Sequence, residues 1–466
     1  ELDIKNPQIA NYAAFKFANQ GEIYVHTRLA ADAVGATKMD RPEWAAVNPK
    51  NGEIYVTLTN NSAANRTPGR VDAANPRAYM DVDGKRGAGN PNGHIIRLRE
   101  NSDQPTAAAF GWDIFLFGAE EDAGDANLSG LTARNSFSSP DGLWFSPTTG
   151  ICWIQTDDGA ITDETNCMLL AAVPGQVGDG GRITVKNSLT VNGATVTGTQ
   201  DTFIGATLGD AKLRLFLLAP KGAEVTGITE TEDGKTLFVA VGSVSNIGEA
   251  GMEVEEGRAM IWEYNLETKR QRKYAVGLRN PNGMDFNPWT GELWTTVNER
   301  DMLGSDLVPD YLTNVPVGAQ YGWPWIYYKN NFDRRVEAPK PKFLQEYTRN
   351  PQYALGPHVA ALGLVFVKEG HVMGGDFASG AFIARHGSWN RKPPSGYDVV
   401  YVAFDKFGNP TGKPVPVLTG FLKDDGTTRG RPTWVEWASD GALLVSDDTA
   451  GIIWRVRSPS ATPAAA

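Results

Sequence analysis

The chain has 466 residues, of which 41% are hydrophobic and 10% aromatic, so it can bury a large core. Its formal net charge of −10 argues against a nucleic acid or an anionic membrane surface as partner, and no run of about 18 apolar residues is present to span a bilayer. The opening residues ELDIKNPQ show no signal-peptide pattern, so we expect any such segment to have been removed.

Strand-like runs follow one another along most of the chain. The first is YAAFKFANQGEIYVHTR, residues 12–28. After it, a glycine-containing turn and a short apolar strand recur six times. These copies begin at Asn48, Ser146, Glu230, Asn287, Ser379 and Ser439. Further strand-like runs precede them at 41–49, 141–147, 223–231, 280–288, 361–367 and 431–438, and most are followed by a third run, at 93–100, 166–173, 259–266, 397–404 and 451–457.

Repeated units of three or four short strands, without a sustained helical period, are typical of an all-β propeller. Six units predict six blades in a single domain, residues 1–466, with a disordered tail at 458–466. We expect the N-terminal strand at 12–28 to complete the last blade, which otherwise ends at 451–457. Two separate β domains are the alternative.

Polar residues at the ends of the inner strands of a propeller converge over its central axis. The strand in NPWTGELWTTVNERD, from Asn287, ends in Asn298, Glu299, Arg300 and Asp301. Other units place polar groups nearby in the repeat: Asp157, Asp158, His386, Asp447 and Asp448. We therefore expect a polar funnel on the axis. Alternatively, Glu299 and Asp301 only solvate a loop.

Residues 240–457 resemble the L-sorbosone dehydrogenase group, relatives of the soluble aldose dehydrogenases that depend on pyrroloquinoline quinone (PQQ). The resemblance is carried by GLRNPNGMDFNPWTGELWTTVNERD, YGWPW, HGSWNR and RGRPTWVEWASDGALLVSDD, which occur in the same order. It implies a six-bladed propeller that binds PQQ and calcium over the axis and oxidises a sugar or aldehyde.

The resemblance also implies site residues. PQQ carries carboxylates, which favour cationic donors, so Arg429 and Arg431 are expected to clamp it, with His386 and Arg391 as further candidates. Surface ion pairs are the alternative for these arginines. Asn280 matches an asparagine beside the cofactor. Calcium favours oxygen ligands, and Asp301 and Met302 match the loop that supplies carbonyls.

The histidine base of these dehydrogenases has no counterpart at the matching position. That position is Ala223, ten residues before Asp233. Oxidation of a sugar hydroxyl or an aldehyde hydrate needs a base near the substrate. Glu224 and His386 are the candidates, although neighbours on a strand point to opposite faces. We therefore expect weak or no dehydrogenase activity.

Residues 6–239 resemble a second family of propellers, the PhoX-type alkaline phosphatases, which hold iron and calcium on the axis. The matching runs include GATKMDRPEWAAVNPKNGEIYVTLTNNS and SPDGLWFSPTTGICWIQTD. The resemblance implies that Arg41 contacts phosphate and that Glu43 and Asp141 bind metal. No cysteine- and glutamate-rich metal segment precedes Arg41, and Cys167 is expected in the core.

The two resemblances meet within DGKTLFVAVGS, inside one predicted strand. The boundary divides the chain into phosphatase-like blades, 1–239, and dehydrogenase-like blades, 240–457, as in a natural or engineered recombinant. Three interpretations stay open: a PQQ- and calcium-dependent sugar or aldehyde dehydrogenase, a metal-dependent phosphomonoesterase, and a chimeric scaffold without efficient activity. The first two imply a small-molecule substrate. A natural chain is expected in the periplasm or outside the cell.

Overall fold

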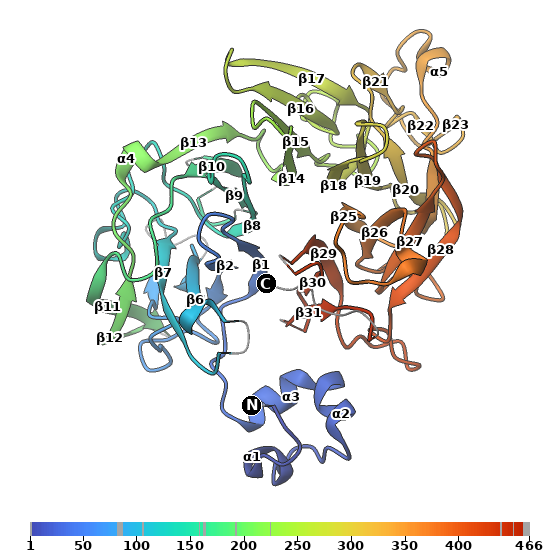
Figure 1. The fold of residues 1–466 in the computed structure, drawn as a ribbon. Coiled ribbons are helices and arrows are strands. Elements are labelled where there is room, and N and C mark those ends of the chain that lie inside the picture. Colours follow the sequence, from blue (N-terminus) through green and yellow to red (C-terminus); the bar gives the residue numbers. More distant parts are fainter. Residues whose placement is uncertain are drawn as a thin grey trace.

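The computed structural model describes residues 2–81, 87–104, 107–157, 159–161, 165–191, 193–223, 225–438, 440–450 and 452–459. Antiparallel sheets stand around a common centre, and the chain passes from one to the next in order (Figure 1). The innermost strands are β1 (Pro42–Val47), β8 (Pro140–Phe145), β14 (Val225–Glu230), β18 (Asn280–Phe286), β25 (Ala361–Phe366) and β29 (Pro432–Trp437). Each lies within one residue of an inner run predicted from the repeat.

The other strands of the sheets follow outward. The second strands are β2 (Ile54–Leu58), β9 (Cys152–Thr156), β15 (Thr236–Val241), β19 (Leu293–Asn298), β26 (Gly380–Arg385) and β30 (Leu443–Asp447). The third are β6 (His94–Glu100), β10 (Met168–Ala172), β16 (Met260–Asn265), β20 (Pro309–Asn314), β27 (Asp398–Phe404) and β31 (Ile452–Val456). The outer are β7 (Phe110–Phe117), β13 (Leu213–Leu218), β17 (Arg270–Val276), β24 (Tyr353–Pro357) and β28 (Pro410–Leu418).

The all-β propeller is confirmed, but the prediction of six blades is wrong. Five blades have four radial strands, and the last sheet, β29–β30–β31, has three. In the described part of the chain, no strand pairs with the outer side of β31. The structure is therefore a five-bladed propeller with a smaller sheet between its last and first blades.

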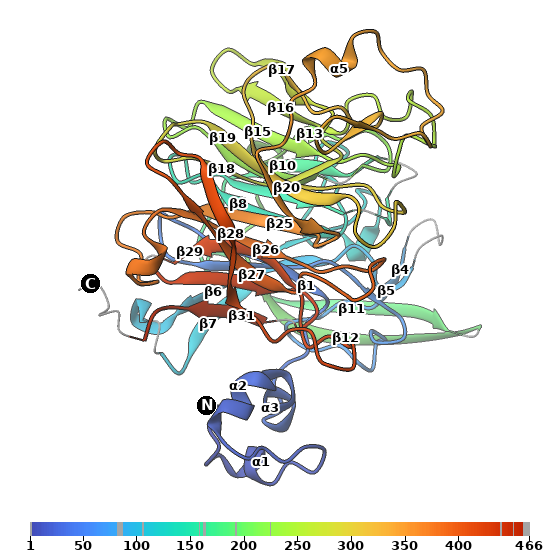
Figure 2. The ribbon, with the colours of Figure 1, turned by 90° about the vertical axis from the view of Figure 1, so that its right-hand side faces the viewer.

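The predicted closing strand is also wrong, because the N-terminal segment is helical. It forms α1 (Pro7–Ala10), α2 (Gln20–Val25) and α3 (Thr27–Ala33), which lie together beside the propeller (Figure 2). Asn19 accepts a hydrogen bond from the Glu22 backbone N–H at 3.1 Å, and Glu22 accepts one from the Ala18 N–H at 2.8 Å. These caps satisfy backbone groups at the start of α2, and the alanine-rich α3 has high helix propensity. Ile9, Ile23 and Ala30 form the small core of this segment.

The remaining strands and helices lie outside the radial strands of the blades. The long hairpin of β11 (Gly181–Val191) and β12 (Ala194–Ile204) extends the first blade. The remaining strands are β3 (Asn61–Ser62), β4 (Tyr79–Met80), β5 (Ala88–Asn90), β21 (Ala319–Gln320), β22 (Ile326–Tyr327) and β23 (Asn331–Phe332), and the remaining helices are α4 (Gly209–Lys212), α5 (Leu344–Tyr347), η1 (Asn101–Asp103), η2 (Gly124–Ala126) and η3 (Gly375–Phe377). Among the helices described, none has both the length and the apolar character needed to cross a bilayer.

Hydrophobic clusters fill the spaces between consecutive sheets. One joins the second and third blades around Trp153, Ile228 and Val239, and the predicted core residue Cys167 lies in it, 4% exposed. This cluster also covers β15, the strand in which the two resemblances meet, so that boundary is packed like the rest of the ring. The contact between the last sheet and the first blade is different. There the rings of Trp44 and Trp434 meet at 4.4 Å between centroids.

Candidate functional site

The charged end of β19 connects loops of three blades. The Asp301 carboxylate accepts a hydrogen bond from Asn390 Nδ2 at 2.9 Å and lies 3.3 Å from His358 Nδ1. Its other oxygen lies 3.9 Å from Arg279 Nη2. The Asp301 backbone N–H donates to Asn246 Oδ1 at 2.8 Å, and its carbonyl accepts from Asn246 Nδ2 at 3.0 Å. We call these five residues the Asp301 network.

The carbonyls implied for calcium have a cationic side chain as partner. Nη1 of Arg335 donates to the carbonyl of Asp301 at 3.0 Å and to that of Met302 at 2.9 Å. Arg335 is held in turn by Asp333, with Nε–Oδ1 and Nη2–Oδ2 distances of 2.9 and 2.7 Å. A guanidinium therefore takes the position predicted for calcium, and this loop does not fit calcium in its present arrangement.

The two residues before Asp301 have a structural role. Glu299 and Arg300 are 3% and 0% exposed and form an ion pair at 2.9 Å. Arg300 also donates to the carbonyls of Pro324 and Ile326. Two of the three charged side chains at this strand end thus form a buried connection to the segment after β21, and neither of them solvates a loop.

A second cluster lies at the entrance to the last sheet. His386 Nε2 is 2.8 Å from Asp448 Oδ2, and both side chains are partly exposed. Arg431 donates to the carbonyls of His386 and Gly387 at 3.0 and 2.7 Å. Burial opposes ionisation of Asp448, but the contact with His386 and the Arg431 charge hold the pKa of Asp448 below its usual value. We call His386, Arg431 and Asp448 the His386 cluster.

The phosphatase-like residues lie near this cluster. Arg41, which has a left-handed φ of 47°, pairs with Glu43 at 2.9 Å and donates to Asn60 at 3.1 Å. Its side chain is 54% exposed, so part of the guanidinium faces solvent. Burial raises the pKa of Glu43, against the Arg41 charge, and Asp448 and Asp157 raise it further. Residues from both halves of the chain therefore meet at one electrostatic site.

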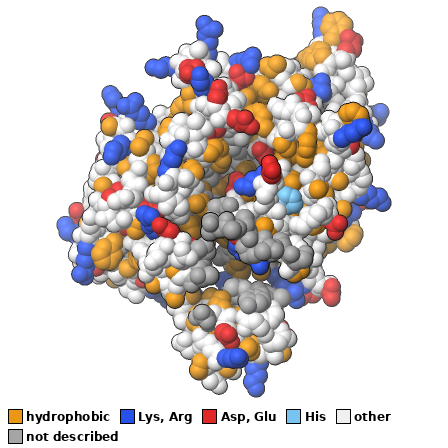
Figure 3. Space-filling model, in the orientation of Figure 1, with side chains coloured by type: hydrophobic (Ala, Val, Ile, Leu, Met, Phe, Trp, Pro, Cys, Tyr) orange, Lys and Arg blue, Asp and Glu red, His pale blue; other side chains and the backbone are white. Residues whose placement is uncertain are grey.

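A surface view along the same direction as Figure 1 supports this picture. The face is hollowed near its centre, where basic, acidic and histidine side chains lie close together (Figure 3). Among the residues that the structure describes, however, no three His, Cys, Asp or Glu side chains are placed to hold one metal ion. Asp141 begins a blade on β8, where its carbonyl accepts from Thr57 Oγ1 at 2.7 Å, and it does not form such a group with Glu43.

Other predicted cofactor residues are used differently. Asn280 accepts from the Ser243 backbone N–H at 3.0 Å. Arg391 pairs with Asp306 at 3.0 Å, while its Nε is buried and has no hydrogen-bond partner among the described residues. Arg429 does not join Arg431 in a clamp, because its side chain lines a separate pocket beside the last sheet.

The predicted base positions are also accounted for. Ala223 precedes β14 and is 2% exposed within the hydrophobic cluster between the second and third blades. Histidine at this position would therefore enter the core and would not reach the axis. Glu224 and Asp158 lie outside the described residues, which leaves His386 as the candidate that can be placed.

Sequence reasoning missed several residues of the site. Arg279 and Asn390 stand inside the quoted motifs, beside Asn280 and Arg391, so the motifs could have indicated them. His358, Asn246 and Arg335 come from loops without a local pattern, and only the tertiary structure brings them to Asp301.

The fold and these clusters define a β-propeller with a polar site over its axis. A family model for alkaline phosphatase PhoX matches residues 2–244, just over half of the chain. The chain belongs to this family. Models for glucose / sorbosone dehydrogenase and for a TrAA12-like family match residues 224–386 and 330–459. The mixed character predicted from the sequence is thereby confirmed.

Individual relatives show the same division. An uncharacterized protein of Borreliella burgdorferi is 33% identical over 253 residues, covering 53% of this chain and 64% of that protein. A pyrroloquinoline quinone-dependent pyranose dehydrogenase of Coprinopsis cinerea is 32% identical over 284 residues, covering 48% of this chain and 38% of that enzyme. The chain thus spans less than two thirds of each relative.

A solved structure agrees on the fold. The calcium structure of the Trichoderma reesei carbohydrate-active enzyme of family AA12 aligns with a TM-score of 0.52 and 18% identity, covering 90% of this chain and 97% of that one. At this identity the likeness supports the propeller fold alone.

Proposed function

We propose that this chain is a PQQ-binding, sugar dehydrogenase-like propeller with low turnover. The observation that carries the proposal is the joining of three dehydrogenase-like segments at one end of the axis. Asn390 of the HGSWNR segment binds Asp301, and Arg431 binds the carbonyls of His386 and Gly387. These segments are far apart in the sequence, and their assembly supports a common site.

Two buried groups favour a ligand at this site. Arg391 Nε is a buried donor and Asn390 Oδ1 a buried acceptor, and neither has a hydrogen-bond partner in the described part of the chain. Buried polar groups normally have partners. PQQ offers acceptors in its carboxylates and quinone oxygens, and it also offers donors, so it fits this pair. Arg431 uses Nε and Nη2 for carbonyls and keeps further N–H donors for an anion.

His386 is the base in this proposal. Asp448 orients its imidazole through the 2.8 Å contact and stabilises the charge that develops when the ring accepts a proton from a substrate hydroxyl. Bound PQQ supplies a quinone that accepts electrons from the substrate. Arg391 and Arg431 would hold its carboxylates.

The expected turnover is low because two features implied by the dehydrogenase resemblance are altered. Ala223 stands in the core where the resemblance implies a catalytic histidine. The carbonyls of Asp301 and Met302 bind Arg335 where it implies calcium. The proposal therefore combines cofactor binding with weak oxidation of a sugar or aldehyde.

An absorbance titration with PQQ, without added calcium, tests the binding. The Arg431→Gln variant should bind PQQ at least tenfold more weakly, as expected for loss of a charged hydrogen bond. The matched Arg429→Gln variant, two residues away, should bind it like the parent chain. Equal PQQ affinities of the parent chain and Arg431→Gln would show that Arg431 does not bind PQQ. Dye reduction with an aldose should be slow, and His386→Gln should abolish it.

Phosphomonoester hydrolysis is the second candidate, favoured by Arg41. Its half-exposed guanidinium lies beside Glu43, whose pKa is raised by burial, and a phosphoryl group suits such a donor. Hydrolysis of p-nitrophenyl phosphate that disappears in Arg41→Gln would support this function. Hydrolysis that survives the substitution would refute the role of Arg41.

A further inference from the structure

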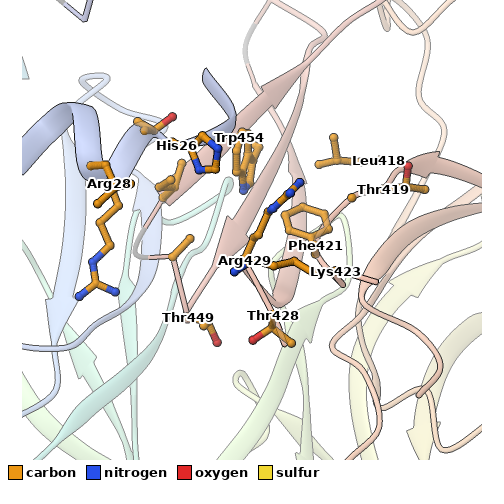
Figure 4. A pocket seen from close by; sticks show the side chains of 15 residues that line it. His26, Arg28, Leu418, Thr419, Phe421, Lys423, Thr428, Arg429, Thr449 and Trp454 are labelled. Atoms are coloured by element: carbon orange, nitrogen blue, oxygen red, sulfur yellow. The ribbon is translucent and has the colours of Figure 1, made fainter. Parts of the chain in front are cut away.

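A pocket lies outside the axis, between the N-terminal helices and the last sheet. It holds about 440 Å³ and is lined by residues 26–29 on one side and by Phe421, Arg429 and Trp454 on the other (Figure 4). This volume is within the usual range for small-molecule sites. The Phe421 and Trp454 rings meet edge to face at 5.8 Å between centroids, which gives the pocket an aromatic wall.

The charge of the pocket contrasts with that of the chain. Arg28, Lys423 and Arg429 line it, and no described aspartate or glutamate does, although the whole chain has a net charge of −10. None of the three side chains forms a hydrogen bond or an ion pair with a residue that the structure describes. The Arg429 side chain lies near Phe421 and Trp454, whereas the Arg28 guanidinium points away from these rings (Figure 4).

We propose that this pocket binds a small amphipathic carboxylate with an aromatic body. The rings of Phe421 and Trp454 would contact the body of the ligand, and Arg429, assisted by Lys423, would pair with its carboxylate. An arginine in a partly apolar site pairs strongly with a carboxylate because few water molecules compete.

The pocket is separate from the site over the axis. Arg431, two residues after Arg429, turns to the carbonyls of His386 and Gly387. Thr449 and Ala450, however, line the pocket directly after Asp448 of the His386 cluster. A ligand in the pocket would therefore touch the loop that carries Asp448, while its binding does not depend on PQQ.

Calorimetric titration with 2-naphthoate tests the proposal, with the neutral 2-naphthamide as an isosteric control. We expect saturable binding of 2-naphthoate and at least tenfold weaker binding of the amide, since only the acid pairs with Arg429. Arg429→Gln should reduce the affinity for the acid about tenfold, and Lys423→Gln should reduce it by a smaller factor.

Arg455→Gln is the matched control. Arg455 follows Trp454 on β31, so it faces the other side of the sheet, where it pairs with Asp440. Arg455→Gln also removes one arginine charge, but on the side of β31 away from the pocket, and should leave the affinity unchanged. Thermal melts confirm that each variant is folded.

The proposal is wrong if neither naphthalene derivative binds, or if both bind equally. It is equally wrong if Arg429→Gln and Arg455→Gln have the same effect, because general electrostatic attraction would then explain the binding. Competition by PQQ at the affinity of the axis site would show that the two sites are one.

Discussion

Arg335 provides the sharpest test of how the Asp301 loop is held. In the parent chain its Nη1 binds the carbonyls of Asp301 and Met302, and its other nitrogens bind Asp333, which is fully buried. Arg335→Ala removes all of these contacts. Asp333 keeps Arg300, at 3.4 Å, as a charged partner. Removing one partner of a buried ion pair costs about 3–5 kcal/mol. We expect about 3 kcal/mol, because Arg335 is itself 29% exposed and Asp333 keeps Arg300.

Calcium distinguishes this explanation from simple destabilisation. In the parent chain, neither calcium nor a chelator should shift the melting temperature, because the guanidinium occupies both carbonyls. In Arg335→Ala the two carbonyl oxygens are freed near the Asp301 carboxylate, a donor set that suits calcium. Calcium at about a hundred times its dissociation constant should then restore about 2.7 kcal/mol.

The assay is thermal unfolding of both proteins with calcium and with chelator. Arg334→Ala is the matched control, since Arg334 is exposed and forms no ion pair with the described residues. It should leave stability and the calcium response unchanged. Equal stabilisation of the parent chain and Arg335→Ala by calcium would refute the reasoning, because Arg335 would then yield its position to the metal.

Three further predictions concern stability. Burial raises the pKa of Asp310 to about 7, above its unfolded value of about 3.9, so its stabilising contribution is present below about pH 4 and is lost as the pH rises through 7. Asp310→Asn should flatten this part of the curve of denaturation midpoint against pH, and an unchanged curve would contradict the assignment. Trp434→Ala removes the contact with Trp44 and should cost about 1 kcal/mol or more, whereas Trp389→Ala, 69% exposed, should cost little in the same melts. Deletion of the first 36 residues should leave the propeller folded, because the helices have their own core; loss of the near-ultraviolet circular dichroism signal would show otherwise.

Much of the ring was predictable because the repeat is local. A glycine turn followed by an apolar run places a second strand, and each innermost strand lies just before it, as for β18 and β19. The N-terminal segment misled the prediction because its apolar residues alternate well enough for a strand. Asn19 and Glu22 carry a capping signal that favours a helix there.

The candidate site was predictable only in part. Asp301 and His386 were found because they end strands or stand in motifs, yet their partners come from loops far along the chain. Asn390 is 89 residues from Asp301, and Asp448 is 62 residues from His386. The separation of Arg429 from Arg431 also needs the structure, because two residues on an irregular strand entry need not share a direction.

The junction between Trp44 and Trp434 sets the order in which the ring is expected to open. Each of the other junctions is sealed by a continuous hydrophobic cluster, such as the one around Phe382, Val435 and Val445 that holds the last sheet to the fifth blade. The ring is therefore closed by one junction that is weaker than the others. Amide protons of β29–β31 should exchange with solvent before those of the five complete blades. A chain pulled from both ends should separate first at the Trp44–Trp434 junction, while the other junctions remain intact.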